Sequence, residues 1–128
     1  MKKLVLLLSV FIFMGCSSDD DNTSSTSDEP QAAVNFQVTN NESISYNIIG
    51  EGASEGVNPE LTLIRGMTYT FSVNAQGHPF FINITQGTST DNAYNEGVTN
   101  NGAQNGTITF VVSMNAPDTL FYNCQFHP

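Results

Sequence analysis

Basic residues are the scarcest functional groups in this sequence. Its 128 residues include 3 lysines and arginines against 12 aspartates and glutamates, and the formal net charge is −9 at pH 7. Lys2 and Lys3 lie in the N-terminal segment, which leaves Arg65 as the single basic residue of the remainder. Proteins that bind nucleic acid or anionic membranes use clustered lysines and arginines to neutralise phosphates. The sequence therefore predicts neither partner, whereas a protein with a basic face would be attracted to it.

Apolar runs long enough to cross a bilayer are also absent from the sequence. The longest run, residues 4–14, covers about eleven residues, where a membrane-spanning helix needs roughly 20. Because two lysines precede the run and Gly15 and Cys16 follow it, residues 1–15 are predicted to be a signal peptide. The Gly-Cys ending resembles the lipobox of bacterial lipoproteins, in which Cys16 would be acylated and become the N-terminus. The alternative is an ordinary signal peptide that is cleaved nearby.

The segment after Cys16 lacks the residues that build a core. Residues 22–30 consist of Asn, Ser, Thr, Asp, Glu and Pro, a composition that cannot bury enough surface to fold. Residues 17–21 form an acidic stretch that resembles the export tag of surface lipoproteins in the Bacteroidetes. We therefore expect a lipidated N-terminus and disordered tether at 16–30, followed by one domain at 31–128. The resemblance implies a cell-envelope lipoprotein of the outer membrane, facing the cell surface, whose only membrane contact is its lipid anchor.

Helical periodicity is missing from the predicted domain, and short alternating segments take its place. Tyr69, Phe71 and Val73, for example, alternate with polar residues and would face a core together. Turn-forming Gly, Asn and Pro separate the segments, so the pattern predicts an all-β domain with Greek-key β-sandwich architecture. The Gly- and Asn-rich segment 86–106 is unusually long for a connection and is predicted to be functional, mobile or partly turn-structured. The predicted strands cover residues 34–39, 44–49, 61–64, 68–73, 80–85, 107–113 and 119–123.

Histidine and cysteine are rare, with two residues of each in the chain. His78 follows one predicted strand, and Cys124 and His127 follow the last one. If Cys16 carries lipid, Cys124 has no cysteine left to pair with. An unpaired thiol in an exported protein is buried, paired between molecules or bound to metal. Two imidazoles and a thiolate are the ligands of trigonal copper sites that transfer electrons, whereas zinc usually takes four strong ligands.

Four segments of the predicted domain resemble the cupredoxin family, and in particular its secreted plastocyanin-like members. They read Leu-Thr-Leu-Ile-Arg-Gly, Thr-Tyr-Thr-Phe, Gly-His-Pro-Phe and Phe-Tyr-Asn-Cys-Gln-Phe-His-Pro, and begin at residues 61, 68, 77 and 121. The resemblance implies that His78, Cys124 and His127 bind one copper ion in a type 1 site. It also implies that the protein passes single electrons to an unknown redox partner protein and is not an enzyme.

The end of the sequence departs from the pattern of this family. Members usually continue past the second histidine through a methionine ligand to a final strand, whereas Pro128 is the last residue here. The domain is therefore expected to be C-terminally incomplete, to lack its final strand and to leave an exposed strand edge beside its N-terminal strands. The carbonyl of Gly77 could supply a weak axial oxygen, and Met67 and Met114 are expected to be packing residues.

The resemblance has one further implication. An aromatic shell of Phe80, Phe81, Tyr122 and Phe126 would exclude water from the copper and tune its potential. Two other functions stay open: a copper delivery protein that holds Cu(I) through the same side chains, and a metal-free surface module that binds proteins or glycans. Visible colour separates electron transfer from Cu(I) delivery, and metal content separates both from the surface module.

Overall fold

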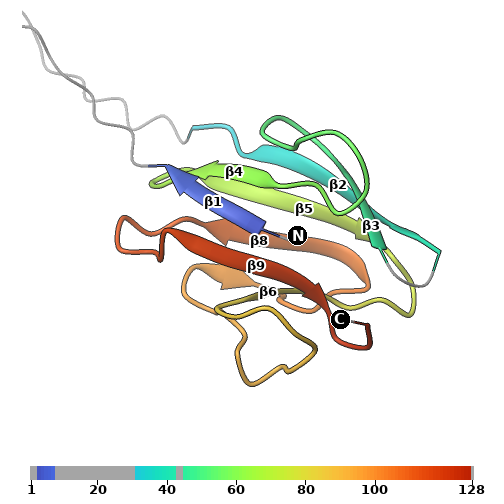
Figure 1. Cartoon of the computed structure of the whole chain (residues 1–128). Helices are drawn as coiled ribbons and strands as arrows, with labels where there is room; N and C mark the ends of the chain where they lie inside the picture. The colour runs from blue at the N-terminus through green and yellow to red at the C-terminus, as the bar shows by residue number, and fades with distance from the viewer. Residues whose placement is uncertain (1–2, 8–30, 43–44, 128) are drawn as a thin grey trace, which may run out of the picture.

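The computed structural model describes residues 3–7, 31–42 and 45–127, and these residues form nine strands and no helix. The strands make two sheets that lie against each other, one in the order β4-β1-β9-β6 and the other in the order β3-β2-β5-β8-β7 (Figure 1). The predicted all-β sandwich is therefore confirmed. The strands are β1 (Lys3–Leu7), β2 (Val34–Asn41), β3 (Ser45–Ile49), β4 (Leu61–Ile64), β5 (Thr68–Asn74), β6 (Phe80–Asn83), β7 (Val98–Thr99), β8 (Asn105–Val111) and β9 (Thr119–Cys124).

The five-stranded sheet follows the alternation that the sequence predicts. Tyr69, Phe71 and Val73 of β5 are buried, and the polar residues between them face outward. β5 pairs in parallel with β2, which places Phe36 opposite Phe71 with 5.2 Å between the ring centroids. Fully burying a side chain of this size contributes about 1.5–3 kcal/mol. These rings therefore stabilise the part of the core that the five-stranded sheet contributes.

The four-stranded sheet contains a strand that the sequence analysis did not predict. β1, from the N-terminal apolar run, pairs in parallel with β4 and antiparallel with β9. Its side chains alternate, so that Leu4 is 1% exposed and Leu7 is 52% exposed. β1 pairs with β9 on the side that β6 leaves free, so β9 has no open edge in this structure, and the edge strands of this sheet are β4 and β6. An edge that a continuation of the chain would fill stays a prediction.

The apolar residues of β1 explain this position. Leucine and valine fit a strand that is buried on one face, whereas the same residues were predicted only to be part of an export signal. The assignment of residues 1–15 as a signal peptide concerns processing of the chain and stays a prediction. Cys16 and the proposed tether at 16–30 lie outside the described residues.

The Gly- and Asn-rich segment after β6 is built from turns around one side chain. The Asn101 amide accepts a hydrogen bond from the Ile82 N–H at 2.8 Å and donates to the Ile82 carbonyl at 3.1 Å. It also donates to the Tyr94 carbonyl at 3.0 Å. Asn101 therefore pairs with the edge of β6 as a neighbouring strand would. Segment 86–106 was predicted to be functional, mobile or partly turn-structured, and the structure shows turns in it.

The position of β1 can be tested on the full chain, expressed so that the N-terminal segment is retained. Leu4→Ala should lower the free energy of unfolding by about 2–5 kcal/mol, because it leaves a cavity beneath a buried strand. Leu7→Ala, on the same strand but exposed, should change it by less than about 0.5 kcal/mol. Urea denaturation measures both. Equal, small effects would show that β1 does not lie in the sheet.

Candidate metal centre

The pairing of β6 with β9 brings the two predicted ligand segments to one end of the sandwich. The two strands are antiparallel, and Phe80, the first residue of β6, lies opposite Cys124, the last residue of β9. His78 precedes β6 by two residues, and His127 follows β9 by three. The segments before β6 and after β9 must therefore meet, although 46 positions separate His78 from Cys124 in the sequence.

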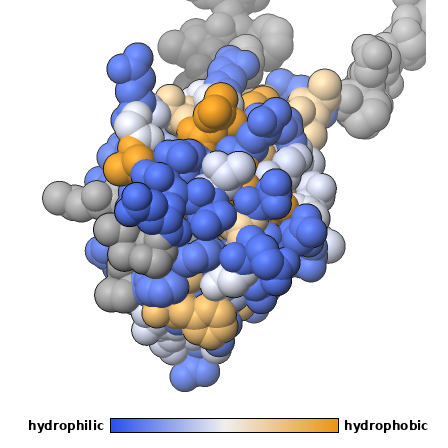
Figure 2. Space-filling view, turned by 90° about the vertical axis from the view of Figure 1, so that its right-hand side faces the viewer, coloured by the Kyte–Doolittle hydropathy of each residue, from blue (hydrophilic) through white to orange (hydrophobic). Residues whose placement is uncertain are grey.

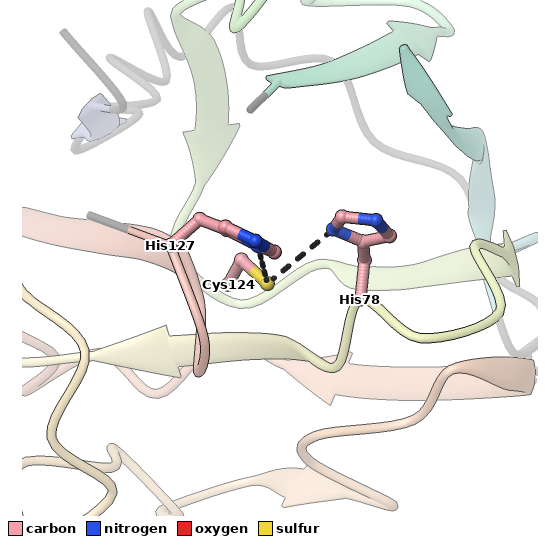
Figure 3. Close-up of side chains that lie close together, drawn as sticks. All are labelled: His78, Cys124 and His127. Atoms are coloured by element: carbon pink, nitrogen blue, oxygen red, sulfur yellow. Dashed lines mark hydrogen bonds between the residues drawn. The ribbon is translucent and has the colours of Figure 1, made fainter. Parts of the chain in front are cut away.

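The three predicted side chains converge on one another at this end. The Cys124 Sγ atom lies 3.7 Å from Nδ1 of His78 and 3.5 Å from Nδ1 of His127 (Figure 3). The two imidazole rings stack, with 4.9 Å between their centroids and 26° between their planes. All three potential ligand atoms lie within 4.8 Å of one another. The structure thus brings together the predicted residues into a group that could hold a metal ion.

These distances fit a shared metal ion. A metal bonded to nitrogen at about 2.0 Å and to sulfur at about 2.3 Å, with about 110–120° between the bonds, holds the two atoms about 3.5–3.7 Å apart. The two Sγ to Nδ1 distances are 3.5 and 3.7 Å. If Nδ1 is the ligand atom of each histidine, the imidazole proton resides on Nε2.

The three side chains differ in their access to solvent. Cys124 is 3% exposed and is a free thiol in the described part of the chain. His78 and His127 are half-buried. A small ion can therefore reach the imidazoles from the surface, while the sulfur is shielded from bulk solvent and from oxidants.

Hydrogen bonds fix the segment that carries His78. The backbone N–H of His78 donates to the Ala75 carbonyl at 2.8 Å, and the Gly77 N–H donates to the Gln104 side chain at 2.8 Å. Gly77 has a φ of 83°, in the left-handed region that glycine adopts without strain. The Tyr46 hydroxyl lies 3.1 Å from the carbonyl oxygens of both His78 and Pro79. Tyr46 was not among the predicted site residues, although the alternation within residues 44–49 indicates that one set of side chains faces the core.

Two buried tyrosines lie beneath the cluster with Phe80. The rings of Tyr46 and Phe80 meet edge to face at 5.1 Å, and those of Phe80 and Tyr122 stack at 5.2 Å. Burial raises the pKa of Tyr46 far above its ordinary value, and the charge of a Cys124 thiolate and a hydrogen bond to it raise this pKa further. Burial also raises the pKa of Tyr122. Both hydroxyls therefore keep their protons and remain hydrogen-bond donors near neutral pH.

The expected aromatic shell is only partly present. Phe80 and Tyr122 are buried beneath the cluster, whereas Phe126 is 59% exposed and is not packed into the core beside them. Its role in shielding the site stays a prediction. Phe81 points to the opposite face of β6 from Phe80, where it lies against Gly102. The alternation of side chains along a strand explains why two adjacent phenylalanines do not share one face.

The two methionines of the described residues lie away from the cluster. Met67 precedes the seven-residue strand β5, whose far end leads to the His78 segment, and a strand of this length spans about 20 Å. Its sulfur lies 3.8 Å from the Tyr69 hydroxyl, and the residue packs against the core as expected. Met114 is exposed rather than packed and lies close to Gly66. An axial contact from the Gly77 carbonyl stays a prediction.

Comparisons of the chain with models of protein families, with curated proteins and with solved structures found no match. The part of the chain that the structure describes contains no helix that is long and apolar enough to cross a bilayer. Function must therefore be inferred from the geometry of the cluster and from the sequence motifs.

Proposed function

We propose that this protein binds one copper ion through His78, Cys124 and His127 and transfers single electrons. The observation that carries the proposal is the pair of Sγ to Nδ1 distances, 3.5 and 3.7 Å, which match those that one bound ion would impose. Soft thiolate and imidazole ligands in a trigonal set favour copper over magnesium, calcium or a four-coordinate zinc. Copper would supply the one-electron couple between Cu(I) and Cu(II).

The contribution of the protein is to keep its ligands in place when the charge of the site changes. Cys124 is the last residue of β9 and pairs with Phe80 of β6, and the His78 segment is tied to Ala75, Gln104 and Tyr46. Ligands held in this way move little between two oxidation states, and a small reorganisation favours fast electron transfer. The proposal assigns no substrate and no catalytic acid or base to the protein.

Electrons would enter and leave through the half-buried imidazoles, because the sulfur is covered. The right-hand side of the molecule in Figure 1 is mainly hydrophilic, with small, separate hydrophobic areas (Figure 2). With a formal net charge of −9, such a surface favours a redox partner that presents a basic face. Phe126, which is exposed next to His127, would add one apolar contact.

Copper delivery is the second candidate function, and the limited ligand set favours it. The cluster offers three ligands, and neither methionine of the described residues lies beside it. Three soft ligands suit Cu(I), and half-buried imidazoles allow a partner to approach the ion. A delivery protein would hold Cu(I) without strong colour, whereas an electron carrier would absorb visible light intensely in its Cu(II) form.

Copper titration of the full chain tests the proposal, with Cys16→Ser as the background so that Cys124 is the only thiol. We expect binding of one copper ion per chain and an intense visible band from the thiolate. Cys124→Ser should abolish the band, and His78→Ala should weaken copper affinity by at least tenfold. Met67→Leu, a substitution far from the cluster, serves as the control.

Each outcome of the titration has a distinct meaning. If the protein binds one Cu(I) ion tightly and shows no visible band after oxidation, delivery is favoured over electron transfer. Absence of binding would contradict the proposed site and favour a metal-free surface module. Binding that survives Cys124→Ser unchanged would also contradict the site, because the copper would then be held by other residues.

We also propose that the protein is a lipoprotein of the outer membrane that faces the cell surface. The motif at Gly15 and Cys16 supports this location, and several acyl chains are expected because one gives only marginal membrane binding. Cys16→Ala should yield unprocessed or soluble protein in a bacterial host with lipoprotein export, as measured by fractionation and mass spectrometry. A variant that matures normally and still partitions with membranes would disprove lipidation at Cys16.

A further inference from the structure

Tyr46 connects the five-stranded sheet to the segment that carries His78. It lies on β3, is 1% exposed and reaches across the sandwich to the residues before β6 in the other sheet. Its hydroxyl is 3.1 Å from the His78 carbonyl oxygen and 3.1 Å from the Pro79 carbonyl oxygen. The single hydroxyl proton therefore faces the carbonyl of a proposed ligand and that of the next residue, and it also lies within hydrogen-bonding reach of the Cys124 sulfur.

The backbone of Tyr46 is itself fixed by Asn58. The Tyr46 N–H donates to the Asn58 side-chain oxygen at 2.9 Å, and the Asn58 N–H donates to the Tyr46 carbonyl at 2.8 Å. Asn58 has a φ of 49°, a left-handed conformation that asparagine tolerates better than most residues. Tyr46 is thus anchored on its backbone at one end and bonded to the His78 segment at the other.

The ring of Tyr46 also contacts both strands that support the cluster. It meets Phe80, at the start of β6, at 5.1 Å and Tyr122, two residues before Cys124, at 6.2 Å. Both contacts are edge to face, with 75° and 64° between the ring planes. Packing on both sides restricts the ring to one orientation, so the hydroxyl is held where the two carbonyls need it.

We propose that Tyr46 is a positioning residue for the metal site, whose hydroxyl orients His78 before any metal binds. The inference rests on the proposed function, to which it adds a residue that contacts no metal. A side chain that fixes a ligand in its bound orientation raises metal affinity because less freedom is lost on binding. Loss of such an outer contact typically weakens metal binding by about 10–100-fold.

Tyr122 provides a matched control within the same aromatic cluster. It is equally buried, and its hydroxyl donates to the Pro59 carbonyl at 2.7 Å, in a segment that carries none of the three ligands. Tyr46→Phe and Tyr122→Phe each remove one buried hydroxyl and keep the ring. Both should lower the midpoint of urea unfolding by similar amounts, so a difference between them in metal binding cannot come from stability alone.

The test compares both variants with the parent chain in the Cys16→Ser background, using Co²⁺ and Cu²⁺ as probes. Tyr46→Phe should weaken affinity for both ions by about tenfold or more and shift the thiolate-to-metal absorption band. Tyr122→Phe should change affinity by less than threefold and leave the band in place. Equal losses in both variants, or no loss in Tyr46→Phe, would overturn the positioning role.

A measurement on the metal-free chain separates this inference from the proposed function. Imidazole nitrogen shifts and relaxation, measured by NMR, should show His78 altered and more mobile in Tyr46→Phe but unchanged in Tyr122→Phe. This result would uphold the orienting role even if the parent chain bound no metal, in which case only the copper proposal would fail. An unchanged His78 in Tyr46→Phe would overturn the inference whether or not metal binds.

Discussion

The antiparallel pairing of β6 with β9 is the constraint on which the candidate site depends. This register places the start of one strand opposite the end of the other, with Phe80 facing Cys124. A slip of one residue would turn the Cys124 side chain to the other face of the sheet and separate its sulfur from both imidazoles. The same register buries Phe80 and Tyr122 under the cluster. Fold and site are thus stabilised by the same contacts, and a metal ion would add to this stability by binding only the folded chain.

β1 makes the completeness of the four-stranded sheet depend on the N-terminal segment. In the structure, β1 satisfies backbone groups of both β4 and β9 and buries Leu4 and Leu6. Processing at Cys16 would remove this strand and expose the facing edges of its two neighbours. Unpaired edges of this kind promote association with other strands. Because β9 carries Cys124 at its end, the strand that lies beside β9 in the place of β1 would also influence how firmly the thiol is held.

Local sequence patterns predicted much of this architecture, and the failures have physical causes. Alternation within residues 68–73 and 107–113 predicted β5 and β8, because a half-buried strand leaves a period of two. β1 was missed because its uninterrupted apolar residues, preceded by lysines, are typical of export signals. The convergence of His78 with Cys124 could be predicted because rare ligand types follow predicted strands. The contact of Tyr46 with the His78 segment could not, since it requires the relative placement of two sheets.

The central claim is that His78, Cys124 and His127 hold one copper ion together. X-ray absorption at the copper edge tests it most directly, on the full chain in the Cys16→Ser background loaded with one equivalent of copper. We expect one sulfur at about 2.2–2.3 Å and two imidazole nitrogens at about 2.0 Å from the copper. A coordination shell made only of nitrogen and oxygen would contradict the three-ligand site, because Cys124 would then not be a ligand.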